Sequence, residues 1–553
     1  MIFDRTFHPD EANQAFTTGK LLETGVYTYR PTDHHGPTLY YAAAPLQQAF
    51  GHTSTATLDG TLLRCTPLVF AVAGLVFLYL AVLRLVRQTQ GPKRHRTWLL
   101  PLIPVLLVAT TPLYVFYATD FIQEMLLVCF TLMMFWAGTG YCLPGRRLKR
   151  GTWAILFGIG AGLCFATKET CVLTFAALFG AALPFLLLAW RTRRNATEEA
   201  TDAPAADRPR TGVVSHLVLA AFGFGIVSLV LFSSFCRDWH GVYNAFIAAP
   251  LSYVHRAAGD AASDGAAWHV HPWWQHLVWL FHGNPLAAGK TGSIDHTFRH
   301  LRPLAHLLLV LIPVGLLCRF GKRRSAFNQP LVTAFLGTAL YALLLLIAYS
   351  CIPYKTPWCT LQLAVPYVTA ASLGYLVACG FFLDFVRTRG ERLRIKLDSG
   401  VLAFIFLLFL PASVLMEHVP GLLAINRKPD DASIPYNYAH ASPEAKQLAA
   451  CVADVMAQAN AKATAPDAGK PFVAVALPPT DTWPFPFYNR RLEAQTGYWT
   501  KFDDLVELQK KGVQPTVVIV PMTEGHMVQM LYPNLKNTRR FFMRPGVRVR
   551  VFW

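Results

Sequence analysis

The stretch "LLRCTPLVFAVAGLVFLYLAVLRL", residues 62–85, decides the fold of this chain. It is almost continuously apolar and long enough to cross a hydrocarbon core of about 30 Å as a single helix. Comparable runs recur along the first three quarters of the sequence. We therefore expect ten membrane-spanning helices, over residues 62–85, 98–117, 121–142, 153–167, 171–190, 213–235, 303–317, 330–351, 361–383 and 401–416.

The composition agrees with a membrane protein. Of 553 residues, 53% are hydrophobic and only 15% are charged, whereas soluble domains carry about 25% charged residues. A net charge of +18 is also typical of nucleic-acid-binding proteins. Here, however, the basic residues gather in short loops between apolar runs, which is a topology signal rather than a binding groove. We expect no nucleic-acid partner.

The charged loops predict which side of the membrane each segment faces. Lys and Arg are concentrated in five loops, near residues 84–96, 146–150, 191–194, 319–324 and 387–396. Cytoplasmic loops carry this excess, so alternation places the turns at 119–120 and 168–169, the loop 353–358 and both ends of the chain outside. We expect a multi-pass protein of the cytoplasmic (inner) membrane with its C-terminal domain outside.

The N-terminal segment "HPDEANQAF", residues 8–16, is the exception to this pattern. It is polar and is predicted to lie outside, yet no apolar helix precedes it to carry it across. We interpret it as the first external loop of a protein whose first transmembrane helix is missing from this sequence.

The last part of the chain has the composition of a soluble domain, so we divide the protein into a membrane part, 1–418, and an extracytoplasmic α/β domain, 419–553. Ser442 and Pro443 mark the start of an amphipathic helix. "PFVAVAL" and "PTVVIVP" are typical of buried parallel strands, with the helical "FDDLVELQKKG" between them and "VRVRVFW" as a terminal strand. No glycine-rich phosphate loop occurs there, so we assign this domain no catalysis.

Ionisable residues are predicted at the outer ends of several helices, facing one shared surface. A single ionisable group at a helix end can simply be hydrated by interfacial water and needs no function. Several such groups together, in otherwise apolar or short loops, favour a functional site. A carboxylate there can take a proton from an incoming hydroxyl, while cations neutralise a departing phosphate. The residues are Asp10, Glu11, His34, His35, Asp120, Lys168, Glu169 and Lys355.

Taken in order, "HPDEANQA…HHGPTLYY…YATDF…ATKE…YKTPW" resembles the GT-C class of membrane glycosyltransferases, in the protein mannosyltransferase and aminoarabinose transferase group. Within it the pattern is most similar to the flippase-activity-associated family. The resemblance covers roughly residues 1–416. It implies a hexosyl or pentosyl transferase that uses a polyprenyl-phosphate-linked donor, inverts the sugar centre, and has a glycan, lipid or protein acceptor.

The resemblance also implies roles for the residues. Asp10 matches the catalytic aspartate of the first external loop, Glu11 its partner, and Asp120 a second functional aspartate. We expect Asp10 to act as the base and Glu11 to orient it or its helix. Lys168 and Lys355 match the family's basic residues, and with Glu169, His34 and His35 they are expected to bind substrate. His34 and His35 depart from the Glu-Lys or His-Pro of relatives. The motifs indicate no particular cofactor, and they leave open whether the protein uses a divalent metal.

Two other functions fit the same sequence. A non-catalytic helper of lipid-linked sugar translocation has no need of the outer acidic and basic residues. A secondary transporter is disfavoured because the charges lie at one set of helix ends and no paired broken helices occur. The nearby histidines show no repeated ligand spacing, so we interpret them as interfacial rather than metal ligands; they are His269, His271, His276 and His282.

Overall fold

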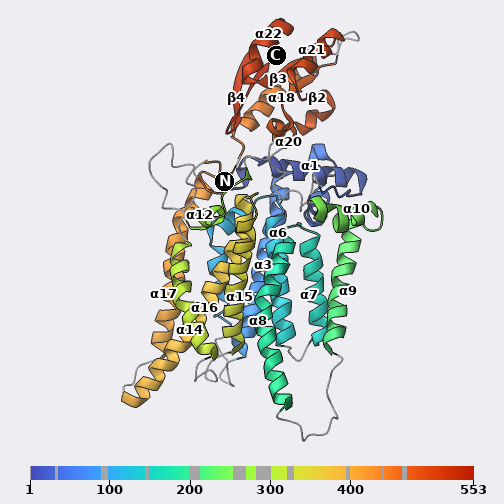
Figure 1. Cartoon of the computed structure of the whole chain (residues 1–553). Helices are drawn as coiled ribbons and strands as arrows, with labels where there is room; N and C mark the ends of the chain where they lie inside the picture. The colour runs from blue at the N-terminus through green and yellow to red at the C-terminus, as the bar shows by residue number, and fades with distance from the viewer. Residues whose placement is uncertain are drawn as a thin grey trace.

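The structure, a computed structural model, describes residues 2–31, 35–88, 98–143, 148–198, 212–252, 269–281, 301–320, 329–393, 399–431, 434–438, 440–463 and 470–553. Long helices form a bundle, short helices cover one end of it, and a small α/β domain stands on that cover (Figure 1). The N-terminal segment and the α/β domain therefore lie at the same end of the bundle, as the alternation of charged loops predicts.

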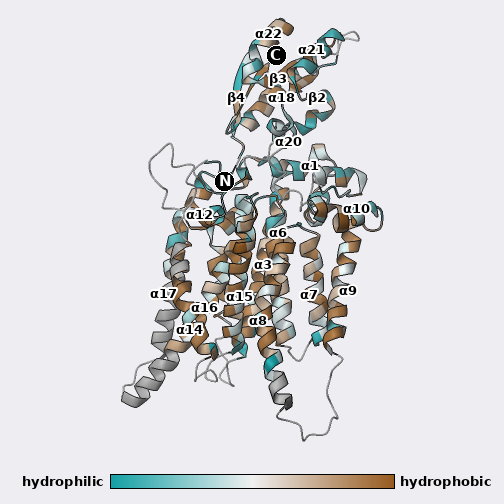
Figure 2. Cartoon of the chain, in the orientation of Figure 1, coloured by the Kyte–Doolittle hydropathy of each residue, from teal (hydrophilic) through white to brown (hydrophobic). Residues whose placement is uncertain are grey.

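Each of the ten predicted spans coincides with helical structure. Among the described residues six helices are long and apolar enough to cross a membrane, and two more, α7 and α14, contain shorter apolar segments. Figure 2 shows mostly apolar residues along the bundle and a mixture of apolar and hydrophilic residues in the α/β domain. The multi-pass helical fold is confirmed. The helices are α3 (Gly60–Arg87), α4 (Leu102–Ala109), α5 (Pro112–Tyr117), α6 (Glu124–Cys142), α7 (Arg150–Phe165), α8 (Cys171–Glu198), α9 (Gly212–Phe232), α14 (Arg302–Phe320), α15 (Gln329–Cys351), α16 (Thr360–Leu393) and α17 (Ser399–Arg427).

One predicted span is not a continuous helix. The run expected over 98–117 is divided into α4 and α5 at Thr110 and Thr111. Pro112 has no N–H to continue the helical ladder, and a residue before proline avoids the helical conformation. Thr111 is accordingly extended, with ψ of 122°. The prediction of one straight helix was wrong at this point because apolar composition alone does not report the break.

The short helices at the end of the bundle nearest the α/β domain build its cover. They are α1 (Pro9–Thr24), α2 (Thr38–Ala49), α10 (His240–Tyr243) and α12 (Gln275–Phe281). Helix α1 lies between the bundle and the α/β domain (Figure 1). Because α1 begins with Pro9, Asp10 and Glu11, this position brings the acidic pair directly over the membrane helices.

The α/β domain contains a five-stranded sheet in the order β2-β1-β3-β5-β4. The predicted parallel pairing of the two buried strands is confirmed, with Val473 opposite Val517. The terminal strand is also confirmed, and it pairs antiparallel with β3 and β4. The elements are α18 (Glu444–Lys462), β1 (Val473–Ala476), α19 (Pro479–Thr482), α20 (Phe485–Asn489), β2 (Thr496–Trp499), α21 (Phe502–Lys510), β3 (Val517–Pro521), α22 (Gly525–Leu531), β4 (Thr538–Arg544) and β5 (Val547–Phe552).

The division expected at residues 418 and 419 falls inside α17, which continues to Arg427. We therefore propose the end of α17 as the boundary of the membrane part. Helix α18 follows after a short connection and begins at Glu444, whose N–H donates to the Ser442 hydroxyl at 3.2 Å. The N-cap residue is Pro443, one position after the predicted Ser442, and the Ser442 hydroxyl still accepts an N–H of the first turn.

Candidate active site

The first turn of α1 fixes where Asp10 and Glu11 point. His8 is the N-cap residue: its Nδ1 accepts the Asp10 N–H at 3.1 Å, and the Glu11 carboxylate accepts the His8 N–H at 3.0 Å. This reciprocal capping box, with Pro9 in the first position, holds the helix start in one orientation. Successive helical residues point about 100° apart. Glu11 is therefore fully buried, whereas the Asp10 side chain is 50% exposed.

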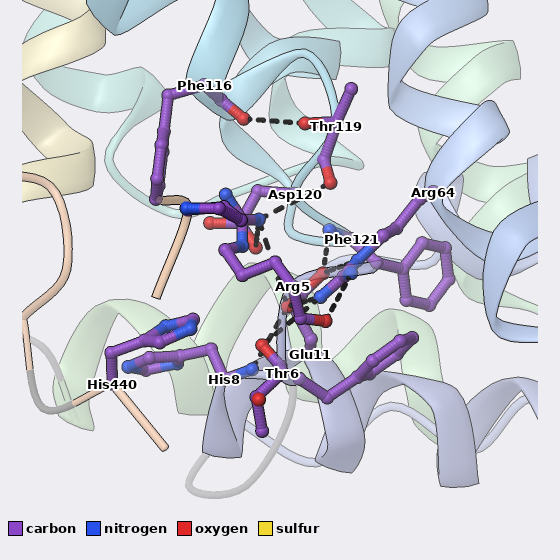
Figure 3. Close-up of polar contacts among 12 residues, drawn as sticks. Arg5, Thr6, His8, Glu11, Arg64, Phe116, Thr119, Asp120, Phe121 and His440 are labelled. Carbon is purple, nitrogen blue, oxygen red and sulfur yellow. Dashed lines mark hydrogen bonds and ion pairs between the residues drawn. The ribbon is translucent and has the colours of Figure 1, made fainter. Parts of the chain in front are cut away.

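Glu11 lies in a buried cluster of four charged side chains from four segments. Arg64 of α3 forms a bidentate ion pair with the Glu11 carboxylate. Its Nε donates to Oε1 at 2.9 Å and its Nη2 donates to Oε2 at 2.7 Å. The N–H of Phe121 donates to Oε1 at 2.9 Å. Arg5 lies 4.0 Å from Glu11 and 3.1 Å from Asp120 (Figure 3). The cluster joins α1 to α3 and to the turn before α6.

The two carboxylates of this cluster have opposite electrostatic environments. Burial alone raises the pKa of Glu11, but Arg64 and Arg5 outweigh it and hold that pKa well below its usual range. The pKa of Asp120 is raised well above its usual value, first by burial and then by the neighbouring Glu11 charge. Glu11 is therefore an ionised anchor, and Asp120 is the member of the cluster that most readily carries a proton.

The Asp10 side chain lies outside this cluster, 3.8 Å from Nδ1 of His8, whose ring packs on the loop before α16 and on the connection after α17. The His8 ring lies 5.5 Å from the Trp358 ring and 6.2 Å from that of His440. Burial lowers the pKa of His269, and the nearby Asp10 carboxylate partly offsets this. Asp10 is thus a half-exposed carboxylate on a capped helix start, beside the imidazole of His8 and close enough to His269 to influence its charge.

Lys355 reaches the same region through the chain around His269. Its N–H donates to the His269 carbonyl at 2.8 Å, and the two segments form a β-bridge between Val270 and Tyr354. The Lys355 ammonium donates to the carbonyls of Ile352 and His271. The side chain is buried, and burial lowers its pKa. The structure therefore brings Asp10 and Lys355, predicted from separate loops, into one neighbourhood.

Lys168 has a partner that the sequence did not identify. Its ammonium forms a buried ion pair with Glu124, the first residue of α6. Burial lowers the pKa of Lys168, but the Glu124 carboxylate more than offsets that and raises it well above the usual value. The amide of Gln362 donates to the Glu124 carbonyl at 3.0 Å. Glu124 is an ionisable residue within the apolar run 121–142, and that placement is the signal by which the sequence could have identified it.

Glu169, the neighbour of Lys168, binds His35 on the other side of the turn. The Nδ1 atom of His35 lies 2.8 Å from one carboxylate oxygen, and the Tyr29 hydroxyl donates to the other at 2.6 Å. Burial raises the pKa of Glu169, but His35 and Tyr29 outweigh it and lower that pKa to about 2. A Cβ on Gly36 would lie 2.2 Å from the Ala166 carbonyl oxygen, so glycine permits this close approach. His34 lies outside the described residues.

The predicted site residues thus form three polar groups beneath and beside α1. One is the Glu11 and Asp120 cluster, one is the Asp10 and Lys355 region, and one is the turn with Lys168 and Glu169. A further polar set lies between α1, α2 and the turn before α6, where Gln123 donates to Gln14 at 3.1 Å and approaches the Tyr40 hydroxyl at 3.4 Å. Sequence reasoning missed these three side chains, and it also missed Arg5, Tyr29, Arg64 and Glu124.

A large apolar cavity lies within the bundle, between α6, α8, α15 and α16. Its volume is about 640 Å³, and its lining includes Phe135, Leu178, Phe185, Tyr341 and Gln362. Gln362 also binds the backbone of Glu124, so the cavity reaches the level of the Lys168 ion pair. A long apolar molecule with a polar end fits such a space.

The described residues contain no group of three or more His, Cys, Asp or Glu side chains placed to hold a metal ion. His269 and His271 lie on the loop against Tyr354 and Tyr438 rather than around a common point. Trp279 also packs on His271, at 5.4 Å. His269 and His271 are thus engaged in ring packing, while His282 lies outside the described part of the chain.

The helical bundle, its layer of short helices and the small α/β domain give a fold shared with solved structures of membrane glycosyltransferases, so the predicted fold class is confirmed. The solved structures most similar to this chain include the aminoarabinose transferase ArnT from Cupriavidus metallidurans bound to undecaprenyl phosphate. It is 13% identical, with a TM-score of 0.57 over 99% of this chain and 94% of that one. The same protein in its apo state gives 14% identity and a TM-score of 0.51 over the same shares. No family model and no curated protein matches the chain.

Proposed function

We propose that this protein is a glycosyltransferase that moves a sugar from a polyprenyl-phosphate-linked donor to an acceptor on the outer face of the cytoplasmic membrane. The observation that carries the proposal is the first turn of α1. It buries Glu11 as an ionised anchor and leaves Asp10 as a half-exposed carboxylate above the bundle. A fixed, accessible carboxylate is what a transfer to a hydroxyl requires of its base.

The apolar cavity supports a lipid donor. It has room for part of a polyprenyl chain, and its Gln362 end lies beside the Lys168 and Glu124 pair. The similar ArnT structure holds undecaprenyl phosphate, which is a lipid of this class. A chain seated in the cavity would bring its phosphate to the outer end of the bundle, where Lys168 and Lys355 lie.

In the proposed reaction Asp10 takes the proton of the acceptor hydroxyl as the oxygen attacks the anomeric carbon of the sugar. The bond between that carbon and the phosphate oxygen breaks, and the electron pair leaves with the polyprenyl phosphate. Lys355 and Lys168 stabilise the charge that develops on the phosphate. Attack from the face opposite the phosphate inverts the anomeric centre. The acceptor is a glycan, a lipid or a protein hydroxyl.

The same proposal sets the orientation of the protein. The five basic loops face the cytosol, and α1, Lys355 and the α/β domain face the external, periplasmic side of the membrane. The α/β domain is then the extracytoplasmic domain of a two-part protein.

The test is sugar transfer from a radiolabelled polyprenyl-phosphate donor by purified variants, measured beside donor binding. We expect Asp10→Asn to lower the transfer rate by about 10²–10⁴-fold, the usual contribution of a general base. Donor binding and protein abundance should change little, because the amide is nearly isosteric and the side chain is half exposed. The matched control is Asp503→Asn, an exposed aspartate of α21. Transfer by Asp10→Asn at the wild-type rate would remove the enzymatic proposal and favour a non-catalytic helper.

A further inference from the structure

The α/β domain contributes side chains to the packing around α1. Phe487 of α20 is 2% exposed and stacks on Phe7, with ring centroids 4.2 Å apart. Phe487 belongs to the same buried apolar cluster as Ala12 of α1 and Leu63 of α3. The domain is therefore not merely attached to the end of α17, because one of its aromatic rings completes the core beneath the N-terminal segment.

Backbone groups of the N-terminal segment bind the same domain. The N–H of Phe7 donates to the Tyr488 hydroxyl at 2.7 Å, and Lys446 of α18 donates to the Asp4 carbonyl. Nearby, Arg490 donates to the Leu58 carbonyl at 2.7 Å. Chain ends are poorly ordered unless other elements tie them down. Here the residues that lead into the acidic pair are tied by the last quarter of the chain.

The connection between α17 and α18 adds a second set of bonds, directly to the cap of α1. Asp430 accepts the Thr6 N–H at 2.8 Å and binds Nε2 of His440 at 3.1 Å. The His8 Nε2 lies 2.9 Å from the Tyr438 carbonyl. Because Nδ1 of His8 accepts the Asp10 N–H, the ring proton lies on Nε2 and is donated to Tyr438. The ring that orients Asp10 is thus itself oriented by residue 438.

We propose that the C-terminal domain and its connection act as a clamp that sets the position of the first turn of α1. Tyr488, Asp430 and His440 are positioning residues: they hold the backbone of residues 6–8, and through the His8 cap they hold Asp10. Their effect on catalysis rests on the proposed function, while the clamp itself does not. A displacement of about 1 Å at a reacting group can lower the rate about 10²-fold. A clamp that holds Asp10 in position would prevent that loss.

Amide hydrogen exchange of residues 6–16 in the full-length purified protein tests the clamp without any activity assay. Tyr488→Phe removes the acceptor of the Phe7 N–H, and we expect exchange of this segment to rise roughly threefold to tenfold, the equivalent of one hydrogen bond. The matched control is Tyr532→Phe, whose hydroxyl donates to Leu505 at 3.0 Å inside the α/β domain. It should leave the exchange of residues 6–16 unchanged.

A comparison of two substitutions at His440 distinguishes a positioning role from general destabilisation of the protein. His440→Ala removes the partner of Asp430, whereas the side-chain amide of His440→Gln can still donate to it. We expect faster exchange of residues 6–16 and a lower kcat in the alanine variant, with a donor KM within about twofold of wild type, because the lipid cavity is untouched. The glutamine variant should recover both values.

Unchanged exchange of residues 6–16 in both Tyr488→Phe and His440→Ala would overturn the clamp, as would an equal rise in Tyr532→Phe. A different result separates the two proposals. If exchange rises as expected while even the wild-type protein transfers no sugar, the clamp stands and the proposed function fails.

Discussion

The two neighbouring acidic residues of α1 occupy opposite environments, although the sequence presents them as a pair. Glu11 is fully buried against two arginines and a backbone N–H. Asp10 is half exposed, and its carboxylate lies 3.8 Å from the His8 ring. A buried charge needs partners to offset its lost hydration, so Glu11 serves the fold. Asp10 has no such hydration cost to offset, and its exposure is the property that the proposed base requires.

The largest expected effect is a loss of stability on substitution of Glu11. Glu11→Gln leaves the Arg64 guanidinium buried without its carboxylate, while Arg5 keeps Asp120 at 3.1 Å. Loss of one partner of a buried pair typically costs ~3–5 kcal/mol. We expect a strongly lowered free energy of unfolding in detergent, against a change within about 0.5 kcal/mol for Asp10→Asn, which is typical of exposed positions. Equal losses in the two variants would contradict the assignment of one residue to the fold and the other to the site.

A second prediction compares the two lysines. Lys355→Ala should lower turnover by about 10²–10³-fold, as loss of one preorganised donor does. Its ammonium binds only backbone carbonyls in the described contacts, so no carboxylate is left buried alone. Lys168→Ala should also lower the free energy of unfolding, because it leaves the Glu124 carboxylate buried without its ion-pair partner.

The double variant Lys168→Ala/Glu124→Gln sharpens this second prediction. It should recover part of the lost stability without recovering transfer, since the coupling between contacting residues is about 0.5–3 kcal/mol. Additive losses of stability in the double variant would show that the two side chains do not depend on each other. Melting and transfer are measured on the same preparations.

The smallest expected effect concerns pH. Burial lowers the pKa of His440 to about 4, with Arg5 and His8 acting in the same direction and Asp430 against them. The released chain binds a proton below the ordinary value of 6.5, whereas the docked histidine does not, so docking weakens as pH falls from 6.5 toward 4.

The readout for this pH dependence is the protection of residues 6–16 at pH 7 and pH 5. We expect protection to fall at pH 5 in wild type and to fall less in His440→Gln, which has no titrating ring. His526→Gln, at an exposed position of α22, is the control and should follow wild type. A profile for His440→Gln identical to that of wild type would show that another group sets the pH dependence.

Much of the fold could be predicted from the sequence because it depends on properties that are local along the chain. Apolar length identifies a span, and the ten predicted spans all coincide with helices. Alternating buried runs with a helix between them predict a parallel pair of strands, and β1 and β3 form that pair. The break between α4 and α5 escaped this reasoning, although Pro112 marks it, because one proline in an apolar run can also sit inside a helix, as Pro67 does in α3.

The sequence by itself also determined which residue types gather at the outer end, since ionisable groups are expensive in the hydrocarbon layer and collect at helix ends. Only the tertiary structure decided their partners. Arg64 and Glu11 are separated by 53 residues and meet only when α1 lies across α3. Asp430 and Thr6 are 424 residues apart. Such distant contacts decide whether a carboxylate is a buried, ion-paired anchor or an accessible base. Burial and neighbouring charges, rather than residue type, set the free-energy cost of its charge.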